Sequence, residues 1–222
     1  EAQLKMLRYQ LNPHFLFNTL NAISALVRLK KASQASAMIV QLSDFLRYSL
    51  DNDPIQSVTL EDEMTAVRLY LDIEKTRFGE RLKLDFDIHP DTLGVKVPSL
   101  ILQPLVENAV KYAIAPQELG GTISITTRAQ GRYCAIKMVD TGCSGVDLVD
   151  GEIAAPHTTK GTGVGLRNTI DRLKNFYDDS YTFKLLATDS GGLCIEMLLP
   201  LQYTTSDWHA DRSRKPILAN LK

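Results

Sequence analysis

The sequence has few cysteines and no long apolar run, and each absence removes a class of protein. Its three cysteines, Cys134, Cys143 and Cys194, are odd in number and widely spaced. This pattern does not suit a disulfide framework or a zinc site, and it indicates reduced thiols. No apolar run approaches the ~20 residues that cross a bilayer, and no signal peptide is recognisable.

The chain also lacks an excess of either charge. Its 25 lysines and arginines nearly balance 26 aspartates and glutamates, which leaves a formal net charge of −1. Without a basic field, bulk nucleic-acid binding is not expected. The chain starts at Glu1 already in helical pattern, so we expect it to be a fragment of a longer protein.

An unusual feature of the first segment is a histidine directly after a proline, in Gln10-Leu-Asn-Pro-His-Phe-Leu-Phe-Asn18. Residues 2–30 otherwise predict one amphipathic helix, and a proline inside a helix costs about 3 kcal/mol. We therefore expect a kink at Pro13 that serves the neighbouring His14. Projected at 3.6 residues per turn, the helix gathers one apolar arc, made of Phe15, Leu16, Leu20, Ala22, Ile23, Leu26 and Val27.

The polar side of the same helix carries His14 with Asn18, Asn21 and Arg28. His14 and Asn18 are four residues apart, so the amide is close enough to orient the imidazole. Taken alone, His14 could equally be a solvent-facing histidine beside a kink.

A second amphipathic helix is predicted over residues 34–50 and forms an antiparallel hairpin with the first. Its apolar stripe consists of Ala35, Met38, Ile39, Leu42, Phe45, Leu46 and Ser49. Two helices have too little core to be stable alone, so the stripe predicts a partner. The simplest partner is a second copy, which completes a four-helix bundle; the alternative is that the stripe packs against the rest of the same chain.

The pattern changes after the hairpin, which ends at Asp51-Asn-Asp-Pro54. Thr59-Leu-Glu-Asp62 predicts a helix start, and that helix stops near Gly79. Beyond it the sequence predicts an α+β two-layer sandwich with helices on one face of a sheet. The predicted strands are 82–88, 122–126, 133–139, 182–186 and 193–199, and the predicted helices are 99–115 and 165–177. The polar tail after residue 200 is expected to be poorly ordered.

Three segments of this second half carry candidate chemistry. In the first, Leu102 to Tyr112, Asn108 and Lys111 lie off the apolar face. An asparagine carbonyl suits magnesium, and lysine can pair with a phosphate. In the second, Asp140 ends a strand before Gly142 and Gly145. A carboxylate held in this turn could accept the amino proton of adenine.

The third segment, Lys160-Gly-Thr-Gly-Val-Gly-Leu-Arg-Asn168, is a glycine-rich loop that opens into a helix. Backbone N–H groups at a helix start bind phosphate, and glycines allow close approach. The spacing matches neither a P-loop nor the dinucleotide fingerprint. Each segment alone is a weak signal, but the ordered set of the three is strong.

With these segments the chain resembles the nucleotide-binding domain of the GHKL ATPases. With the Asn-Pro-His-Phe-Leu-Phe-Asn segment upstream, it closely resembles the LytS-type sensor histidine kinases. Tyr70-Leu-Asp-Ile-Glu74 with Arg77-Phe78, and Asn168 with Arg172-Leu173 and Tyr177, are also similar to that family. The resemblance implies a helical hairpin, a four-helix bundle as a dimer, followed by a GHKL sandwich. Its expected divisions are a dimerisation and phosphotransfer domain (1–58), a linking helix (59–79), a GHKL ATP-binding catalytic domain (80–200) and a tail (201–222).

The resemblance also implies roles for individual residues. His14 would be the phosphoacceptor, with Asn18 as a possible orienting residue, and Asn108 would hold the magnesium that bridges the ATP phosphates. The segment from about 146 to 160 would be the ATP lid. The implied ATP-binding residues are Asn108, Lys111, Tyr112, Asp140, Gly142, Gly145, Gly161, Thr162, Gly163, Gly165 and Leu166.

Two positions depart from related patterns. Many histidine kinases place an acid directly after the histidine, where this chain has Phe15, so Asn18 or a residue of the ATP domain must orient the ring. Other GHKL ATPases place a water-activating glutamate one turn before the asparagine, where this chain has Pro104. Glu107 projects about 100° around the helix from Asn108, and its role stays open.

The expected function is ATP-dependent autophosphorylation of His14 and relay to an aspartate of a response-regulator receiver domain, by a homodimer. The resemblance implies the cytoplasmic portion of a membrane-anchored sensor kinase. Two alternatives remain. One is a non-catalytic ATP-sensing dimer module, which the missing acid after His14 keeps open. The other is a GHKL ATPase that hydrolyses ATP, which Pro104 disfavours.

Overall fold

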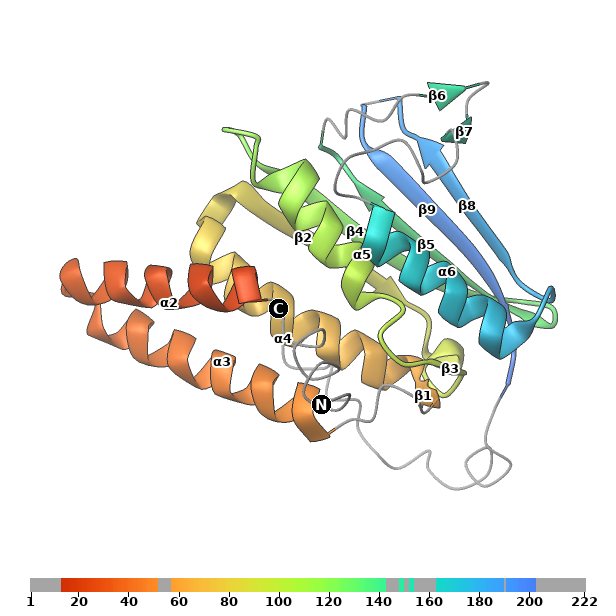
Figure 1. The fold of residues 1–222 in the computed structure, drawn as a ribbon, viewed down its shortest axis with the longest axis horizontal. Helices are drawn as coiled ribbons and strands as arrows, with labels where there is room; N and C mark the ends of the chain where they lie inside the picture. The colour runs from red at the N-terminus through yellow and green to blue at the C-terminus, as the bar shows by residue number, and fades with distance from the viewer. Residues whose placement is uncertain are drawn as a thin grey trace.

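The computed structural model describes residues 13–51, 57–142, 148–149, 152–153, 163–189 and 191–202. The chain begins with a helical hairpin, α2 (Pro13–Arg28) and α3 (Ala32–Asp51), followed by α4 (Leu60–Phe78). In Figure 1 the hairpin lies along α4, which separates it from the rest of the chain. Pro13 is the first residue of α2. The predicted kink depends on residues before Pro13, which lie outside the described ranges.

The hairpin is held to α4 by the stripe that the sequence assigned to a partner. Its residues Ala35, Met38, Leu42 and Phe45 are buried within the single chain. Packing of α3 against α4 accounts for this burial, so the same-chain alternative is confirmed for these four residues. Ile39 of the same stripe stays exposed, as do the apolar side chains of Phe17, Leu20, Val27, Leu29 and Val40 on the hairpin.

Helix α4 begins and ends where its sequence signals predict. Thr59 is the N-cap, and its hydroxyl accepts a hydrogen bond from the Asp62 backbone N–H while the Asp62 side chain accepts from the Thr59 N–H. This capping box satisfies two N–H groups at the helix start. The helix ends at Phe78, because Gly79 takes a positive φ of 59°.

The sheet lies on the far side of α4 from the hairpin. Its strand order is β2-β4-β5-β9-β8-β7-β6. The main strands are β2 (Leu82–Ile88), β4 (Gly121–Gln130), β5 (Tyr133–Asp140), β8 (Thr182–Ala187) and β9 (Leu193–Pro200). The pairing of β2 with β4 is parallel, and the other pairings are antiparallel. The five strands predicted from alternation are therefore confirmed, each to within a few residues at its ends.

Short strands carry no periodic signal, and four were missed. They are β6 (Leu148–Val149) and β7 (Glu152–Ile153) at the sheet edge, and the separate pair β1 (Ser57–Thr59) and β3 (Lys96–Pro98). Strands β6 and β7 fall inside the segment that the resemblance assigns to an ATP lid. The polar tail lies largely outside the described ranges.

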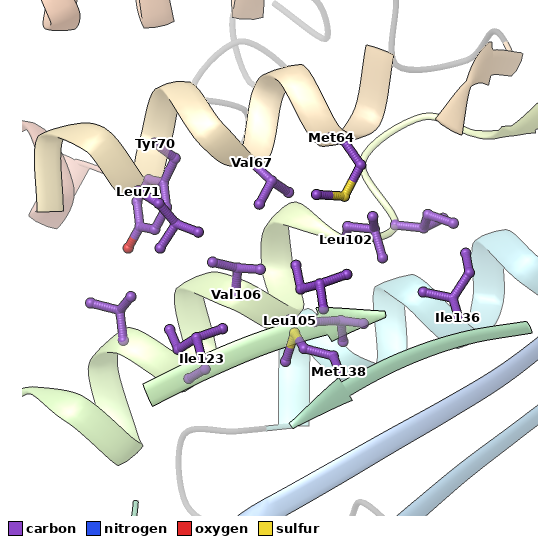
Figure 2. Packing of buried hydrophobic residues seen from close by; sticks show 14 of the residues in the cluster. Met64, Val67, Tyr70, Leu71, Leu102, Leu105, Val106, Ile123, Ile136 and Met138 are labelled. Atoms are coloured by element: carbon purple, nitrogen blue, oxygen red, sulfur yellow. The ribbon is translucent and has the colours of Figure 1, made fainter. Parts of the chain in front are cut away.

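Helices α5 (Gln103–Asn108) and α6 (Gly163–Tyr177) lie side by side between α4 and the sheet. Figure 2 shows Met64, Val67 and Leu71 of α4 above Leu102 and Val106, with Ile123 and Met138 of the sheet below. Burial of such side chains is worth roughly 25 cal/mol per Å² of apolar surface. The two-layer sandwich is thus confirmed. Among the described helices, none is long and apolar enough to cross a membrane.

The helix predicted over 99–115 is shorter at its start and changes its winding. Leu100 has φ of 58°, which places it in the left-handed region and prevents a helix before Gln103. From Ala109 to Ile114 the chain continues as a π-helix, η3. A π turn inside a helix is rare and is found mostly at functional sites.

A buried glutamate of α4 fixes the strained turn before α5. Glu63 is 3% exposed, and its carboxylate accepts the backbone N–H groups of Leu100 (2.5 Å), Ile101 (3.0 Å) and Leu102 (3.0 Å). Burial raises the pKa of Glu63, and the three backbone hydrogen bonds oppose that rise. The carboxylate thus joins α4 to the start of the helix that carries Asn108.

We expect Glu63→Gln to lower the free energy of unfolding by about 2–4 kcal/mol, because the amide cannot accept all three N–H groups and leaves donors unsatisfied. Urea denaturation measures the loss. The matched control is Glu118→Gln, an exposed residue, which should change stability by less than about 0.5 kcal/mol. Equal stabilities of the Glu63 and Glu118 variants would contradict this role.

Candidate functional site

A cavity of about 300 Å³ lies where the hairpin, α4, α5 and the start of α6 meet. Residues from all four elements line it, although they are far apart in sequence. The lining residues are His14, Phe15, Asn18, Tyr70, Glu74, Arg77, Pro104, Glu107, Asn108, Val110, Lys111, Ala115 and Gly165. The proline-histidine segment and the asparagine helix, which the sequence treated as separate signals, therefore share one site.

The asparagine side of the cavity is built by α5 and η3. The buried face predicted for this segment is confirmed, because Leu102, Leu105, Val106, Ala109, Val110 and Ala113 are all buried. Burial of that face leaves Asn108 half-buried and Lys111 exposed at the cavity wall. The ammonium of Lys111 lies 4.6 Å from the ring centroid of its neighbour Tyr112. An amide oxygen and a cation thus line one wall.

The start of α6 completes that wall. A Cβ placed on Gly165 would lie 3.4 Å from Asn108 Nδ2 and 3.6 Å from Pro104 Cβ. The first turn of α6 is therefore packed directly against Asn108. The first backbone N–H groups of a helix have no partner within the helix and carry its positive dipole end, so they favour an anion.

The histidine side of the cavity is fixed by an aromatic cluster. Phe15 is 3% exposed, and its ring centroid lies 5.1 Å from that of Phe45 and 4.9 Å from that of Tyr70. Aromatic pairs at such distances are worth about 0.5–1.5 kcal/mol beyond the area they bury. Phe15 thus fastens α2 to α3 and α4, and the adjacent His14 is left exposed at the cavity.

Asn18 contacts the imidazole, but not in the way expected of an orienting residue. Its Nδ2 lies 3.2 Å from Nδ1 and 3.3 Å from Nε2 of His14. A group along the lone-pair direction of one ring nitrogen would lie much farther from the other. The amide therefore sits over the ring face, away from the in-plane direction along which either nitrogen forms its best hydrogen bond.

A carboxylate cluster forms the floor between the histidine and the asparagine. Both oxygens of Glu74 lie near Arg77 Nη1, at 3.0 and 3.1 Å, and the Tyr70 hydroxyl donates to the same carboxylate. Glu107 approaches from α5 and accepts from Gln103 Nε2 at 3.0 Å. Burial raises the pKa of Glu74 to about 7; Arg77 and Tyr70 lower it and Glu107 raises it.

A second polar position lies at the end of β5, beside η3. Asp140 is 2% exposed, and its Oδ1 accepts the backbone N–H groups of Gly142 and Leu193, both at 3.2 Å. Burial raises the pKa of Asp140 to about 6. Gly142 must be glycine, because a Cβ there would lie 2.2 Å from the Cα of Ala113. The carboxylate is therefore held rigidly against the helix that carries Lys111.

These donors suit a nucleotide with magnesium better than a protein-only metal site. Among the described residues no group of three or more histidines, cysteines, aspartates or glutamates could hold a metal. Magnesium needs few protein ligands when phosphate oxygens and water complete its octahedron. The amide oxygen of Asn108, beside the anion-favouring start of α6, fits that arrangement.

The structure brings together five of the residues singled out from sequence, His14, Asn18, Asn108, Lys111 and Gly165. Other predicted residues, Tyr112, Asp140, Gly142 and Leu166, lie outside the lining of this cavity, and Leu166 is buried. Gly163 is the first residue of α6. Gly145, Gly161 and Thr162 lie outside the described ranges.

Sequence reasoning missed the contribution of α4 to the site. Tyr70, Glu74 and Arg77 follow i, i+4, i+7 spacing, which places them on one helix face. That spacing was the available signal, but it does not say which other element the face meets.

Comparison with known proteins now places the chain. The family model for the histidine kinases matches residues 2–82. Over 96% of its length the chain is 30% identical to the sensor protein LytS of Enterococcus faecalis, covering 36% of it. It is 34% identical to the sensor histidine kinase YpdA of Escherichia coli over 92% of the chain and 35% of the relative. It is 35% identical to the sensor histidine kinase YesM of Bacillus subtilis over 90% of the chain and 33% of the relative.

Among solved structures, the catalytic domain of histidine kinase ThkA in a nucleotide-free form matches with a TM-score of 0.52. The sequences are 15% identical, and the match covers 66% of this chain and 95% of that domain, so it bears on the fold alone. The chain spans about a third of the length of the curated relatives. Within that span, the family model and the curated relatives show that the chain belongs to the LytS-type sensor histidine kinase family.

Proposed function

We propose that this chain is the kinase portion of a two-component sensor and transfers the γ-phosphoryl group of ATP to His14. One observation carries the proposal: His14 lines the same cavity as Asn108, Lys111 and the start of α6. The phosphoacceptor and the phosphate-binding groups therefore meet across a single 300 Å³ space. Phosphoryl transfer depends mainly on alignment and charge stabilisation, which this arrangement supplies.

In the proposed reaction, a ring nitrogen of neutral His14 attacks the γ-phosphorus in line. A nitrogen–phosphorus bond forms, the bond to the bridging oxygen breaks, and the electron pair leaves with ADP. Lys111 and the N–H groups at the start of α6 stabilise the charge on the phosphate oxygens. Asn108 would hold magnesium, which neutralises charge on the phosphates and orients them.

Asp140 is proposed to read the adenine. Its Oδ1 is already engaged by two backbone N–H groups, so Oδ2 remains to accept from the exocyclic amino group. The carboxylate belongs to a rigid strand end beside η3 and can fix the base while the phosphates reach Asn108. The phosphoryl group would then pass from His14 to an aspartate of a response-regulator receiver domain.

The chain is proposed to act as a homodimer through the exposed side of its hairpin. Phe17, Leu20 and Val27 follow one face of α2, and Ile39 and Val40 lie exposed on α3. Apolar side chains gathered this way on a helical pair favour a four-helix bundle.

A non-catalytic ATP-sensing dimer remains the alternative function. Phe15 occupies the position where many histidine kinases carry an acid, and that observation favours the alternative. ATP binding without formation of any phosphoprotein would support it. Steady ADP production without a phosphoprotein would instead indicate a hydrolytic GHKL ATPase.

With labelled ATP, the parent protein should acquire an acid-labile, base-stable phosphate, and His14→Gln should reduce that label to background. The reason is that the variant lacks the attacking nitrogen while its other cavity walls remain. The matched control is His89→Gln, because His89 is exposed after β2 and lies outside the cavity lining. It should label like the parent. Undiminished labelling of His14→Gln would refute the assignment.

Asp140→Asn should weaken ATP binding by at least about tenfold. Because Oδ1 stays bonded to Gly142 and Leu193, the new amide N–H₂ would face the adenine amino group, and two opposed donors cost about 1–3 kcal/mol. Calorimetric titration measures the loss. Tripolyphosphate has no base, so its affinity should not change; an equal loss for both ligands would show a general defect instead.

The double variant Val27→Asp with Val40→Asp should be monomeric by sedimentation, because it places charges on the exposed apolar hairpin surface. Leu119→Asp, at a side chain 96% exposed in the sandwich, should leave the dimer intact. The monomer should still label His14 if transfer occurs within a protomer. A monomer that binds ATP normally but does not label would show that transfer crosses the dimer.

A further inference from the structure

Phe15 leaves His14 without an adjacent acid, and a carboxylate of another helix, Glu74 of α4, lines the same cavity as His14. Phe15 packs on the ring of Tyr70, and the Tyr70 hydroxyl donates to Glu74 one turn further along α4. The contact that docks α2 therefore also sets Glu74 at the cavity that His14 lines. Phe15, the apolar residue in the usual acid position, thus docks α2 so that His14 and the Glu74 carboxylate line one cavity.

The surroundings of Glu74 hold its carboxylate in one place. It is 2% exposed, and Arg77 and Tyr70 both donate to it. A carboxylate has about four lone-pair sites, so these bonds leave capacity for another donor. Asn18 does not compete for that role, because its amide lies over the ring face. A carboxylate in the plane of the ring can therefore accept a hydrogen bond from a ring N–H of His14.

We propose that Glu74 is the positioning residue of His14, accepting the ring N–H so that the opposite nitrogen points its lone pair at the γ-phosphorus. This inference rests on the proposed phosphorylation of His14. As the nitrogen–phosphorus bond forms and ADP departs with the electron pair, the imidazole becomes cationic. Its remaining N–H proton moves to Glu74, which leaves a neutral phosphohistidine and a protonated carboxyl.

The charge environment of Glu74 suits this transfer. Burial and the neighbouring Glu107 raise the pKa of Glu74 to about 7, so it is near even protonation at neutral pH. A proton acceptor works best when its pKa lies near the working pH. The titratable and charged groups that share this site with Glu74 are Tyr70, Arg77, Glu107, His14 and Lys111.

The test compares initial rates of phosphohistidine formation at saturating ATP for the parent and Glu74→Gln, at pH 6 and pH 8. At pH 8 the parent carboxylate is ionised, so the variant should be about 100-fold slower. At pH 6 Glu74 is already mostly protonated in the parent, so the ratio of the two rates should fall toward one. ATP affinity should be unchanged, because Glu74 is proposed to contact the histidine and not the nucleotide.

The matched control is Asp72→Asn, which exchanges a carboxylate for an amide two residues away on the exposed side of α4. Its rate ratio to the parent should stay near one at both values of pH. Glu107→Gln removes the like charge that raises the pKa of Glu74. The rate of phosphohistidine formation by this variant should therefore rise at a lower pH than the parental rate does.

Three outcomes separate the possible results. A Glu74→Gln protein with the parental rate at pH 8, or slowed equally at both values of pH, overturns the positioning role, and equal slowing indicates a structural one. If the ratio of parental to variant rate depends on pH for Glu107→Gln but not for Glu74→Gln, the role belongs to Glu107, and the proposal is also overturned. A parent that binds ATP but forms no phosphohistidine refutes the proposed function itself, a result distinct from the other two.

Discussion

The aromatic contact of Phe15 with Phe45 and Tyr70 is the interaction on which the site depends. It joins α2, α3 and α4 at one point, with ring centroids about 5 Å apart on either side of Phe15. It fixes the start of α2, and with it His14, at the cavity that Asn108 also lines. The same contact explains why the stripe of α3 is buried within the chain, because the hairpin uses it to dock on α4.

Two buried glutamates of α4, Glu63 and Glu74, link this helix to the start of α5 and to the cavity. Glu63 accepts three backbone N–H groups at the start of α5 and has a structural role. Glu74 lies three turns further along, where it receives Tyr70 and Arg77 and lines the cavity. Burial raises the pKa of both. They differ in their donors, because three backbone N–H groups donate to Glu63 while the side chains of Tyr70 and Arg77 donate to Glu74. Helix α4 therefore both fixes the start of α5 and lines the cavity.

The nucleotide side of the cavity is assembled from segments that bury one face and expose the other. The π turn from Ala109 changes the winding after Asn108, and Lys111 stays at the cavity wall. Gly142 permits the strand end that carries Asp140 to lie against Ala113. The first turn of α6 contacts Asn108 through Gly165. Close backbone contacts, more than ion pairs, set the distances among these groups.

The sequence by itself determined the elements and most of the chemistry. Periodicity predicted the hairpin, the capped α4 and five strands, because burial of one face imposes a period of 3.6 or 2. Local residue patterns also singled out His14, Asn108, Asp140 and the glycine loop. It missed β1, β3, β6 and β7, since strands of two or three residues show no period, and it placed the start of α5 too early because the positive φ of Leu100 has no signal in a leucine.

Only the tertiary structure decided which helix faces pack against one another. The sequence assigned the α3 stripe to a second copy, but a stripe reports that a face is buried and not which surface covers it. It noted Tyr70, Glu74 and Arg77 only as part of a segment similar to the family and gave them no role, because their place at the cavity depends on how α2 docks on α4. The carboxylate of Glu74 on α4 lines the same cavity as His14, a relation fixed by packing between helices that no local pattern records.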